Sequence, residues 1–259
     1  MNILAIDAGN SRIKWGYADG SGWLRRGWLP TAEAARLGDA LRELPAPQTI
    51  VVSNVAGAGV RDAITQALAI YDVTPLWVKG CAQQCGVRSS YADPAQLGAD
   101  RWAGLIAAWK LDARAGRACV VVNAGTTMTV DALSSEGVFL GGVIMPGVDL
   151  MRAALDRGTA QLKRQQGAFC YFPDNTADAI MSGALNALAG AVERMCRYLA
   201  QTAQHVENGR PLVVLSGGAA ALIQPRLGVT KAAEVAAAAV ERVDNLVLDG
   251  LLEIAREAA

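Results

Sequence analysis

One local pattern occurs twice in this chain, and it constrains the fold more than any other feature. Each copy begins with a short apolar strand, continues through a polar turn that contains glycine, and ends with two further extended runs. The turns are Asp7-Ala-Gly-Asn-Ser11 and Asn123-Ala-Gly-Thr-Thr127, which start 116 positions apart, close to half of the 259 residues. Repetition at this spacing predicts a duplicated α/β fold with halves at 1–115 and 116–259. Such halves pack with a cleft between them, where ligands usually bind.

The rest of each half alternates between strands and helices. Strands are expected at 2–6, 12–18, 23–29, 49–55 and 75–79, and again at 118–122, 128–133, 138–145 and 212–216. The β-branched run at 49–55 is typical of a buried parallel strand. Helical spacing of apolar residues predicts helices at 32–44, with Thr31 as the N-cap, and at 61–70, 103–111, 148–157, 176–204, 219–223 and 232–256.

The charge balance excludes a broad nucleic-acid-binding surface. Lys plus Arg equals Asp plus Glu at 24 each, and the isoelectric point is near 6.6, so an anion would be held by local backbone dipoles or a metal. The sequence has no apolar run of the roughly 18 residues that span a bilayer and no signal-peptide pattern at its N-terminus. Five cysteines, an odd number, are typical of reduced thiols, which predicts a cytoplasmic protein with no membrane partner. His205 is the only histidine and lies in a polar stretch, which argues against a Ser-His-Asp triad.

Both turns have the chemistry of a phosphate-binding loop. Glycine lets the backbone approach a ligand closely, successive N–H groups can form an anion site, and Ser11, Thr126 and Thr127 add hydroxyl groups. Asp7, which is expected on an exposed turn, and Asp131 are candidates to hold a hydrated magnesium ion. The alternative is two ordinary hairpin turns in which Gly and Asn supply only the turn geometry. The chain contains neither GxxxxGK(S/T) nor GxGxxG, which excludes the P-loop and the Rossmann phosphate site.

Two further segments suggest contacts with a substrate or a nucleotide. Asp100 and Arg101 precede a helical run, where the carboxylate can accept a hydroxyl proton while the guanidinium binds an anion. The alternative is a helix-capping Asp followed by a surface Arg. Ser216-Gly-Gly218 follows a strand and would let a base or ribose approach bare backbone, although Gly-Gly also occurs in plain strand-to-helix turns.

Together, six stretches resemble the type III pantothenate kinases, in the superfamily of acetate kinases, sugar kinases, heat-shock chaperones and actin. They follow the family's order and cover nearly the whole chain: Asp7–Lys14, Gly98–Arg101, Ala124–Thr127, Gly141–Gly147, Asn175–Ile180 and Ser216–Gly218. The resemblance implies duplicated ribonuclease H-like (actin-like ATPase) domains with an ATP site in the cleft between them. It also implies a homodimeric kinase that transfers the γ-phosphate of ATP to pantothenate, giving 4′-phosphopantothenate in the first step of coenzyme A biosynthesis.

The resemblance further implies a role for each matching residue. ATP would be bound through a first phosphate segment, with Asp7 near magnesium, and through Thr126 of the second half. The first segment consists of Asp7, Ala8, Gly9, Asn10, Ser11, Arg12, Ile13 and Lys14. Pantothenate would contact Tyr91, Gly98, Ala99, Asp100, Arg101 and Thr176. Asp100 would be the catalytic proton acceptor, Arg101 would bind the pantothenate carboxylate or steady the developing phosphate charge, and no residue is assigned as a direct metal ligand.

Two positions depart from the family's pattern. Ser11 stands where Thr is common, and it keeps the hydroxyl group. Asn123 stands where many members have an Asp that ligates a monovalent cation, K⁺ or NH₄⁺. The amide oxygen of Asn123 can coordinate potassium without supplying the charge, so the resemblance leaves the cation requirement of this chain open.

Two other functions stay open at this point. Another kinase of the superfamily would act on a sugar or a short acid, which the substrate-pocket segment Gly98–Arg101 argues against. A regulatory accessory protein of the same fold would have no need of Asp7, Asp100, Arg101 and Thr176, and the neutral net charge argues against direct DNA binding.

Overall fold

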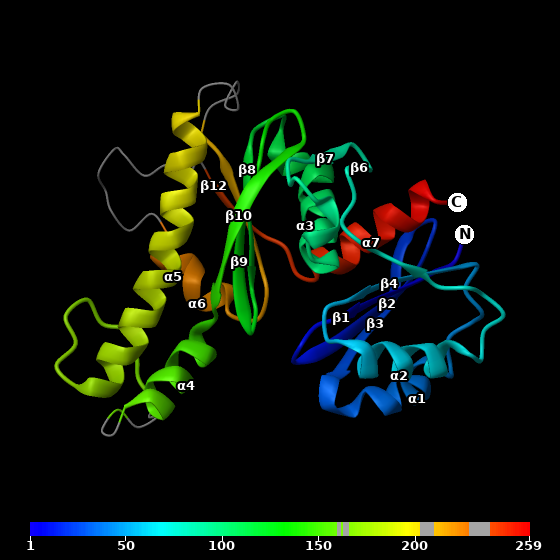
Figure 1. Ribbon diagram of the computed structural model, residues 1–259, viewed down its shortest axis with the longest axis horizontal. Helices are drawn as coiled ribbons and strands as arrows, with labels where there is room; N and C mark the ends of the chain where they lie inside the picture. Colours follow the sequence, from blue (N-terminus) through cyan, green and yellow to red (C-terminus); the bar gives the residue numbers. More distant parts are fainter. Residues whose placement is uncertain (160–161, 163–165, 203–209, 228–238) are drawn as a thin grey trace. The chain divides into compact units, whose positions relative to one another are not determined.

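The structure, a computed structural model, divides the chain into two compact units (Figure 1). Unit 1 comprises Met1–Leu111 and Asn245–Ala259, and unit 2 comprises Asp112–Asp244. The residues that the structure describes are 1–159, 162, 166–202, 210–227 and 239–259. The C-terminal segment thus packs with the N-terminal unit, which differs from the halves expected at 1–115 and 116–259.

Unit 1 is built on a five-stranded mixed sheet. In spatial order its strands are β3 (Gly22–Pro30), β2 (Arg12–Asp19), β1 (Ile3–Ala8), β4 (Thr49–Asn54) and β5 (Leu76–Trp77). β1 pairs antiparallel with β2 and parallel with β4, so the buried parallel strand expected at 49–55 is confirmed. The other elements are η1 (Thr31–Arg36), α1 (Leu37–Leu41), α2 (Ala58–Leu68), β6 (Gln83–Gln84), β7 (Val87–Ser89), η2 (Pro94–Gln96), α3 (Ala99–Lys110) and α7 (Leu246–Glu257).

Alternation along the strands of unit 1 sorts their side chains onto two faces. Ile6 on β1 and Val52 on β4 are buried in one core together with Leu37 of α1 and Ile64 of α2. Figure 1 shows α1 and α2 along this side of the strands. α7 contacts β1 and β4 and packs closely on α3. This packing explains why the last helix of the chain belongs to unit 1.

Unit 2 repeats the strand order of unit 1. Its strands are β10 (Val138–Pro146), β9 (Thr127–Leu133), β8 (Cys119–Ala124), β11 (Leu212–Ser216) and β12 (Ala239–Arg242). As with β1, the central strand β8 pairs antiparallel with β9 and parallel with β11. β10 adds to β9 antiparallel and β12 adds to β11 parallel. The shared order and directions confirm the duplication that the two turns predict.

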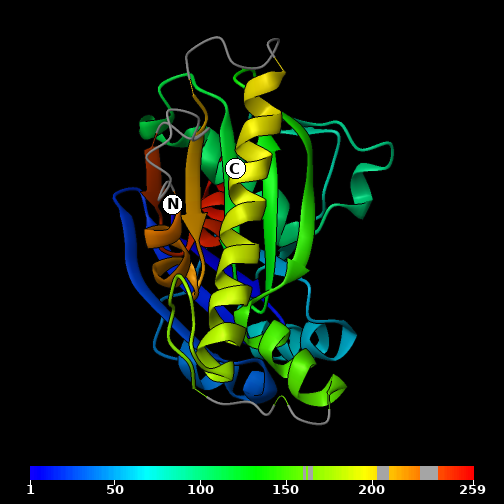
Figure 2. The same ribbon diagram turned by 90° about the vertical axis from the view of Figure 1, so that its left-hand side faces the viewer.

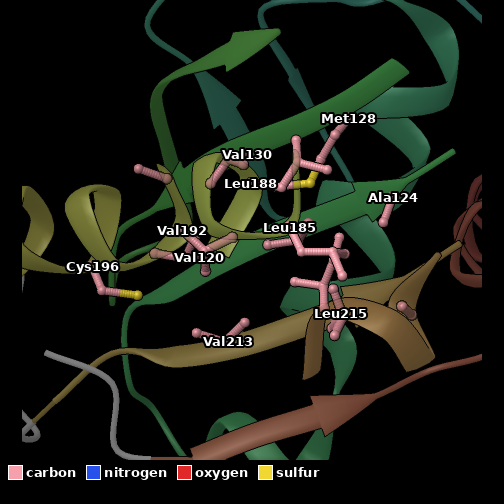
Figure 3. Close-up of a cluster of buried hydrophobic side chains, with 14 of the residues drawn as sticks. Val120, Ala124, Met128, Val130, Leu185, Leu188, Val192, Cys196, Val213 and Leu215 are labelled. Carbon is pink, nitrogen blue, oxygen red and sulfur yellow. The ribbon is translucent and has the colours of Figure 1, made fainter. Parts of the chain in front are cut away.

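One long helix covers a face of the sheet in unit 2. The helices of this unit are η3 (Asp112–Arg114), α4 (Val148–Gly158), α5 (Thr176–Gln201), α6 (Ala220–Ile223) and η5 (Gln224–Arg226). Figure 2 shows α5 running along the sheet, and Figure 3 shows Leu185, Leu188 and Val192 of α5 beside Val120 and Val213. Burying this apolar stripe on the alternating strand residues forms the core of the unit.

Several expectations about helices are wrong. The helix expected from residue 32 is a 3₁₀ turn followed by the five-residue α1, and Pro30 rather than Thr31 precedes it. The helix expected at 232–256 includes strand β12, and α7 begins only after Asn245, whose φ of 61° is left-handed. Residues 232–238, His205 and the end of the helix expected at 176–204 lie outside the described residues. Across the described ranges, no helix is both long and apolar enough to cross a membrane.

The contact between α3 and α7 requires glycine at position 250. A methyl group built on Gly250 would overlap the backbone carbonyl of Ala103 in α3. We therefore expect Gly250→Ala to lower the free energy of unfolding by about 1–3 kcal/mol, since overpacking forces the two helices apart. The control is Gly190→Ala in α5, where a methyl group meets nothing within 4 Å and should raise stability by about 0.5–1 kcal/mol. Urea unfolding measures both, and a Gly250→Ala midpoint at or above that of the wild type would contradict the close helix contact.

Candidate active site

The first glycine turn is held in place by hydrogen bonds from its own hairpin and from Thr31. The Gly9 N–H donates to the Arg12 carbonyl at 3.0 Å, and the Thr31 hydroxyl donates to the Gly9 carbonyl at 2.7 Å. The Thr31 N–H donates to the Ser11 carbonyl at 3.1 Å. Thr31, which the sequence predicts as a helix N-cap, therefore stabilises the glycine turn through its hydroxyl and its N–H.

The predicted phosphate segment splits into exposed and buried residues. Asn10, Ser11 and Arg12 are exposed, whereas Ala8 and Ile13 lie in the core shared with α1 and α2. Ala8 and Ile13 can therefore offer a ligand only their backbone groups. The exposed residues of the turn carry backbone N–H groups and the Ser11 hydroxyl, which are the kinds of group that form anion sites.

Asp7 is buried in strand β1, not exposed on a turn as expected. Only 9% of the residue is exposed, and among the described residues its Oδ1 has no hydrogen-bond partner. Burial, with a further contribution from the negative charge of Asp100, raises the pKa of Asp7 to about 7, against the opposing effect of Lys14. Lys14 is its register partner on β2. A buried carboxylate oxygen that has no hydrogen-bond partner is suited to bind a cation or an ordered water molecule.

Asp100 lies in the first turn of α3 and does not cap the helix. The N-cap is Gly98, which makes no side-chain cap, and the Arg101 N–H donates to Asp100 Oδ1 at 2.8 Å. Burial raises the pKa of Asp100, while the hydrogen bond from the Arg101 N–H and the charge of the guanidinium lower it. The interpretation as a helix-capping Asp is thus wrong. Asp100 is instead a half-buried carboxylate in the first turn of α3, next to Arg101.

Arg101 is a buried residue, which also excludes the interpretation as a surface Arg. It is 8% exposed, and its guanidinium donates to the Tyr91 hydroxyl at 3.4 Å and lies 6.0 Å from the centre of that ring. The structure thus brings two predicted substrate residues together. A guanidinium held beside a tyrosine in this way is oriented to bind an anionic group.

In unit 2, three loops meet at the second glycine turn. The Gly147 N–H donates to the Thr126 carbonyl at 2.9 Å, and the Ala219 N–H donates to the Ala124 carbonyl at 3.0 Å. A methyl group on Gly147 would overlap the turn's backbone, as would one on Gly217, whose φ is +100°. These two glycines are thus required by the packing of the loops, which also leaves Thr126 and Thr127 exposed.

Thr176, the remaining predicted substrate residue, is the first residue of α5. Asn175 is the N-cap, and its side-chain oxygen accepts from the Asp178 N–H at 3.0 Å. Thr176 lines a largely apolar cavity of about 600 Å³ with Met151, Leu155 and Ile180. Thr126 lies in the turn between β8 and β9, whereas Thr176 lies at the start of α5.

The site residues suit a hydrated magnesium ion held by one carboxylate, that of Asp7, rather than a metal ion held by a cluster of protein ligands. In the described part of the chain, no group of three His, Cys, Asp or Glu side chains could hold a metal ion. Mg²⁺ in kinases is usually held by one or two carboxylates, several waters and the substrate phosphates. Asp7, with its unpartnered Oδ1, meets that need. Asp131 is buried in the middle of β9, opposite Val121 on β8, and not at the turn.

Comparisons with known proteins show relatives of similar length. A family model described as type III pantothenate kinase matches residues 3–198. A type III pantothenate kinase of Nitrosospira multiformis is 49% identical over 255 residues, which covers 98% of this chain and 91% of that protein. A type III pantothenate kinase of Aromatoleum aromaticum is 49% identical over 257 residues, 99% of each protein.

A solved structure shows the same fold at much lower sequence identity. A protein from Sinorhizobium meliloti, provisionally described as a 2-dehydro-3-deoxygalactonokinase, superposes with a TM-score of 0.63 and 17% identity. The match covers 98% of both chains. At this identity the likeness concerns the fold, a duplicated α/β architecture of the sugar-kinase type.

Proposed function

The chain belongs to the type III pantothenate kinase family, and from this premise we propose that Asp100 is the proton acceptor of the reaction. The protein is an ATP-dependent kinase that transfers the γ-phosphate of ATP to pantothenate in coenzyme A biosynthesis. It has the duplicated ribonuclease H-like fold of the actin-like ATPases. The observation that carries the assignment of Asp100 is its half-buried carboxylate, which does not cap α3 and which follows the Gly98 N-cap beside the buried Arg101.

Proton transfer and phosphoryl transfer are coupled at the substrate alcohol. The hydroxyl oxygen of pantothenate forms a bond to the γ-phosphorus, the bond from that phosphorus to the β,γ-bridging oxygen breaks, and ADP leaves. The hydroxyl proton passes to the Asp100 carboxylate. Burial makes this carboxylate a better proton acceptor than an exposed Asp, while Arg101 keeps it available in its charged form.

Phosphate binding is proposed for the two glycine turns. The support is the exposed stretch Asn10–Arg12, which follows a glycine whose carbonyl accepts from the Thr31 hydroxyl, together with the exposed Thr126 in the second turn. Bound magnesium would neutralise charge on the phosphates as transfer proceeds. Asp7 would hold it through Oδ1, and Lys14, its neighbour on β2, would supply a second positive charge within the phosphate segment.

Pantothenate is proposed to bind along the start of α3. Gly98 and Ala99 would offer backbone there, and Tyr91 and Arg101 would act as one hydrogen-bonded pair. Thr176, at the start of α5, stays a predicted pantothenate contact. Arg101 then binds either the pantothenate carboxylate or the transferring phosphate. Arg101→Met separates the two roles, since loss of a carboxylate contact raises the pantothenate KM and loss of transition-state contact lowers kcat.

We place the enzyme in the cytoplasm as a homodimer. Free thiols at all five cysteines support a reducing compartment. Phe172 and Tyr171, 96% and 71% exposed just before α5, support a contact surface between subunits. A single-chain mass of 27.0 kDa in light scattering would contradict the dimer.

A coupled assay of ATP consumption with and without pantothenate tests the proposed function. We expect ADP release to depend on pantothenate and on magnesium. Sugars and short hydroxy acids in the same assay should give no turnover above background, and turnover with one of them alone would favour another kinase of the superfamily. Parallel assays in K⁺ and Na⁺ test the monovalent cation, for which Asn123 offers an uncharged oxygen.

A further inference from the structure

Three polar side chains form a row across the sheet of unit 1. Asp7 on β1 is in register with Ser53 on the parallel strand β4 and with Lys14 on the antiparallel strand β2. Residues in register on neighbouring strands point to the same face, with the strands about 4.8 Å apart. Asp7 and Ser53 occupy the face opposite the core formed by Ile6 and Val52. Their side chains are therefore direct neighbours near the ends of two parallel strands.

Both members of this pair carry a buried polar atom without a partner. Ser53 is 0% exposed, and neither its Oγ nor Oδ1 of Asp7 has a hydrogen-bond partner within the described part of the chain. Buried hydroxyl and carboxylate oxygens nearly always have a partner, in the protein, in an ordered water or in an ion. Two such atoms on adjacent side chains indicate one occupant that both of them contact.

The same pair recurs in unit 2. There Asn123 on β8 is in register with Ser216 on the parallel strand β11, and Ser216 is buried as well. β8 and β11 are the counterparts of β1 and β4 in the shared strand order. A serine therefore stands beside the Asp or Asn at the end of the central strand in both units.

We propose that Ser53 is a positioning residue for the magnesium ion at Asp7, with its hydroxyl accepting a hydrogen bond from a water molecule bound to the ion. This inference rests on the proposed role of Asp7. Magnesium loses its water ligands reluctantly, so part of its protein contact passes through bound water. Residues that hydrogen bond to the ligands of a metal orient those ligands and raise its affinity. The serine hydroxyl oxygen has two lone pairs, either of which can accept a hydrogen bond from such a water molecule.

Binding of Mn²⁺ to the full-length protein at saturating ADP tests this role apart from catalysis. Free Mn²⁺ is read from its EPR signal, with ADP alone as the blank. We expect Ser53→Ala to weaken Mn²⁺ binding by about 10–100-fold, while Ser53→Thr, which keeps the hydroxyl, restores most of the affinity. The matched control is Ser134→Ala in unit 2, which is equally buried but accepts from the N–H groups of Glu136 and Val138. Ser134→Ala should lower the stability of the protein, because it removes these two hydrogen bonds, and should leave the Mn²⁺ affinity unchanged.

The outcomes separate this inference from the proposed function. If Ser53→Ala binds Mn²⁺ within about twofold of the wild type while Asp7→Asn loses binding, the role of Ser53 is overturned and that of Asp7 stands. If Asp7→Asn also binds Mn²⁺ like the wild type, the magnesium role of Asp7 fails, and this inference fails with it. Circular dichroism monitors folding, and Ala is smaller than Ser and has no polar atom to satisfy, so the variant keeps the fold.

Discussion

Asp100→Asn is expected to lower kcat by about 10²–10⁴-fold, the usual effect of removing a general base. Asn keeps the shape of the side chain and can still accept from the Arg101 N–H, but it cannot take the hydroxyl proton of pantothenate. The pantothenate KM should change much less than kcat, since the lost interaction belongs to the transition state. The melting temperature should stay the same or rise slightly, because burial already disfavours the charged form of Asp100.

A matched control distinguishes catalysis from a general effect of an Asp in the first turn of a helix. Asp39 lies in the first turn of α1 and pairs with Arg42 on the surface. Asp39→Asn should leave kcat unchanged. Steady-state kinetics and thermal melts of both variants decide the matter, and a kcat of Asp100→Asn within about threefold of the wild type would place the base elsewhere.

Asp7→Asn is expected to abolish most of the activity and, in metal-free buffer, to stabilise the protein above pH 7. Burial raises the pKa of Asp7 from 3.8 to about 7. The folded state therefore binds more protons at this group than the unfolded state between these pH values, and the stability of the wild type falls as pH rises through this range. The loss amounts to about 4 kcal/mol once pH exceeds 7, and Asn does not incur it. Asp7→Ala should likewise lose most of its turnover while keeping the fold.

Thermal melts in EDTA from pH 4 to pH 8.5 measure the effect of Asp7. The difference in melting temperature between Asp7→Asn and the wild type should grow up to about pH 7, stay constant above it, and reach about 5 °C or more. Asp19 is the control, since its hydrogen bonds with Ser21 lower its pKa and Asp19→Asn should give no such gain. Wild-type turnover in Asp7→Asn at saturating magnesium would rule out the metal-linked role, and a pH-independent difference would rule out the buried charge.

Local patterns in the sequence were sufficient to locate the three N-terminal strands and the following parallel strand of each unit. Alternating and β-branched runs mark strands because each strand buries one or both faces, and the two similar turns revealed the duplicated topology. The candidate phosphate turn at Asp7–Lys14 and the candidate substrate pair Asp100 and Arg101 were predicted in the same way, as short stretches with suitable side chains. Predictions failed where a local pattern is compatible with both a helix and a strand. The alanine-rich run at 232–256, predicted as one helix, includes strand β12.

Tertiary structure alone decided which distant residues became neighbours and which charges became buried. Asp7 and Ser53 are 46 positions apart, and only the register between β1 and β4 places them side by side. The burial of Asp7 and the packing of α7 in unit 1 likewise depend on contacts between elements remote in the chain, and the Tyr91 hydroxyl that accepts from the buried Arg101 lies ten positions before it. The periodicity of apolar residues indicates which face of a helix or strand is buried. Which other element packs on that face depends on the whole domain, because long-range contacts outweigh local conformational propensity.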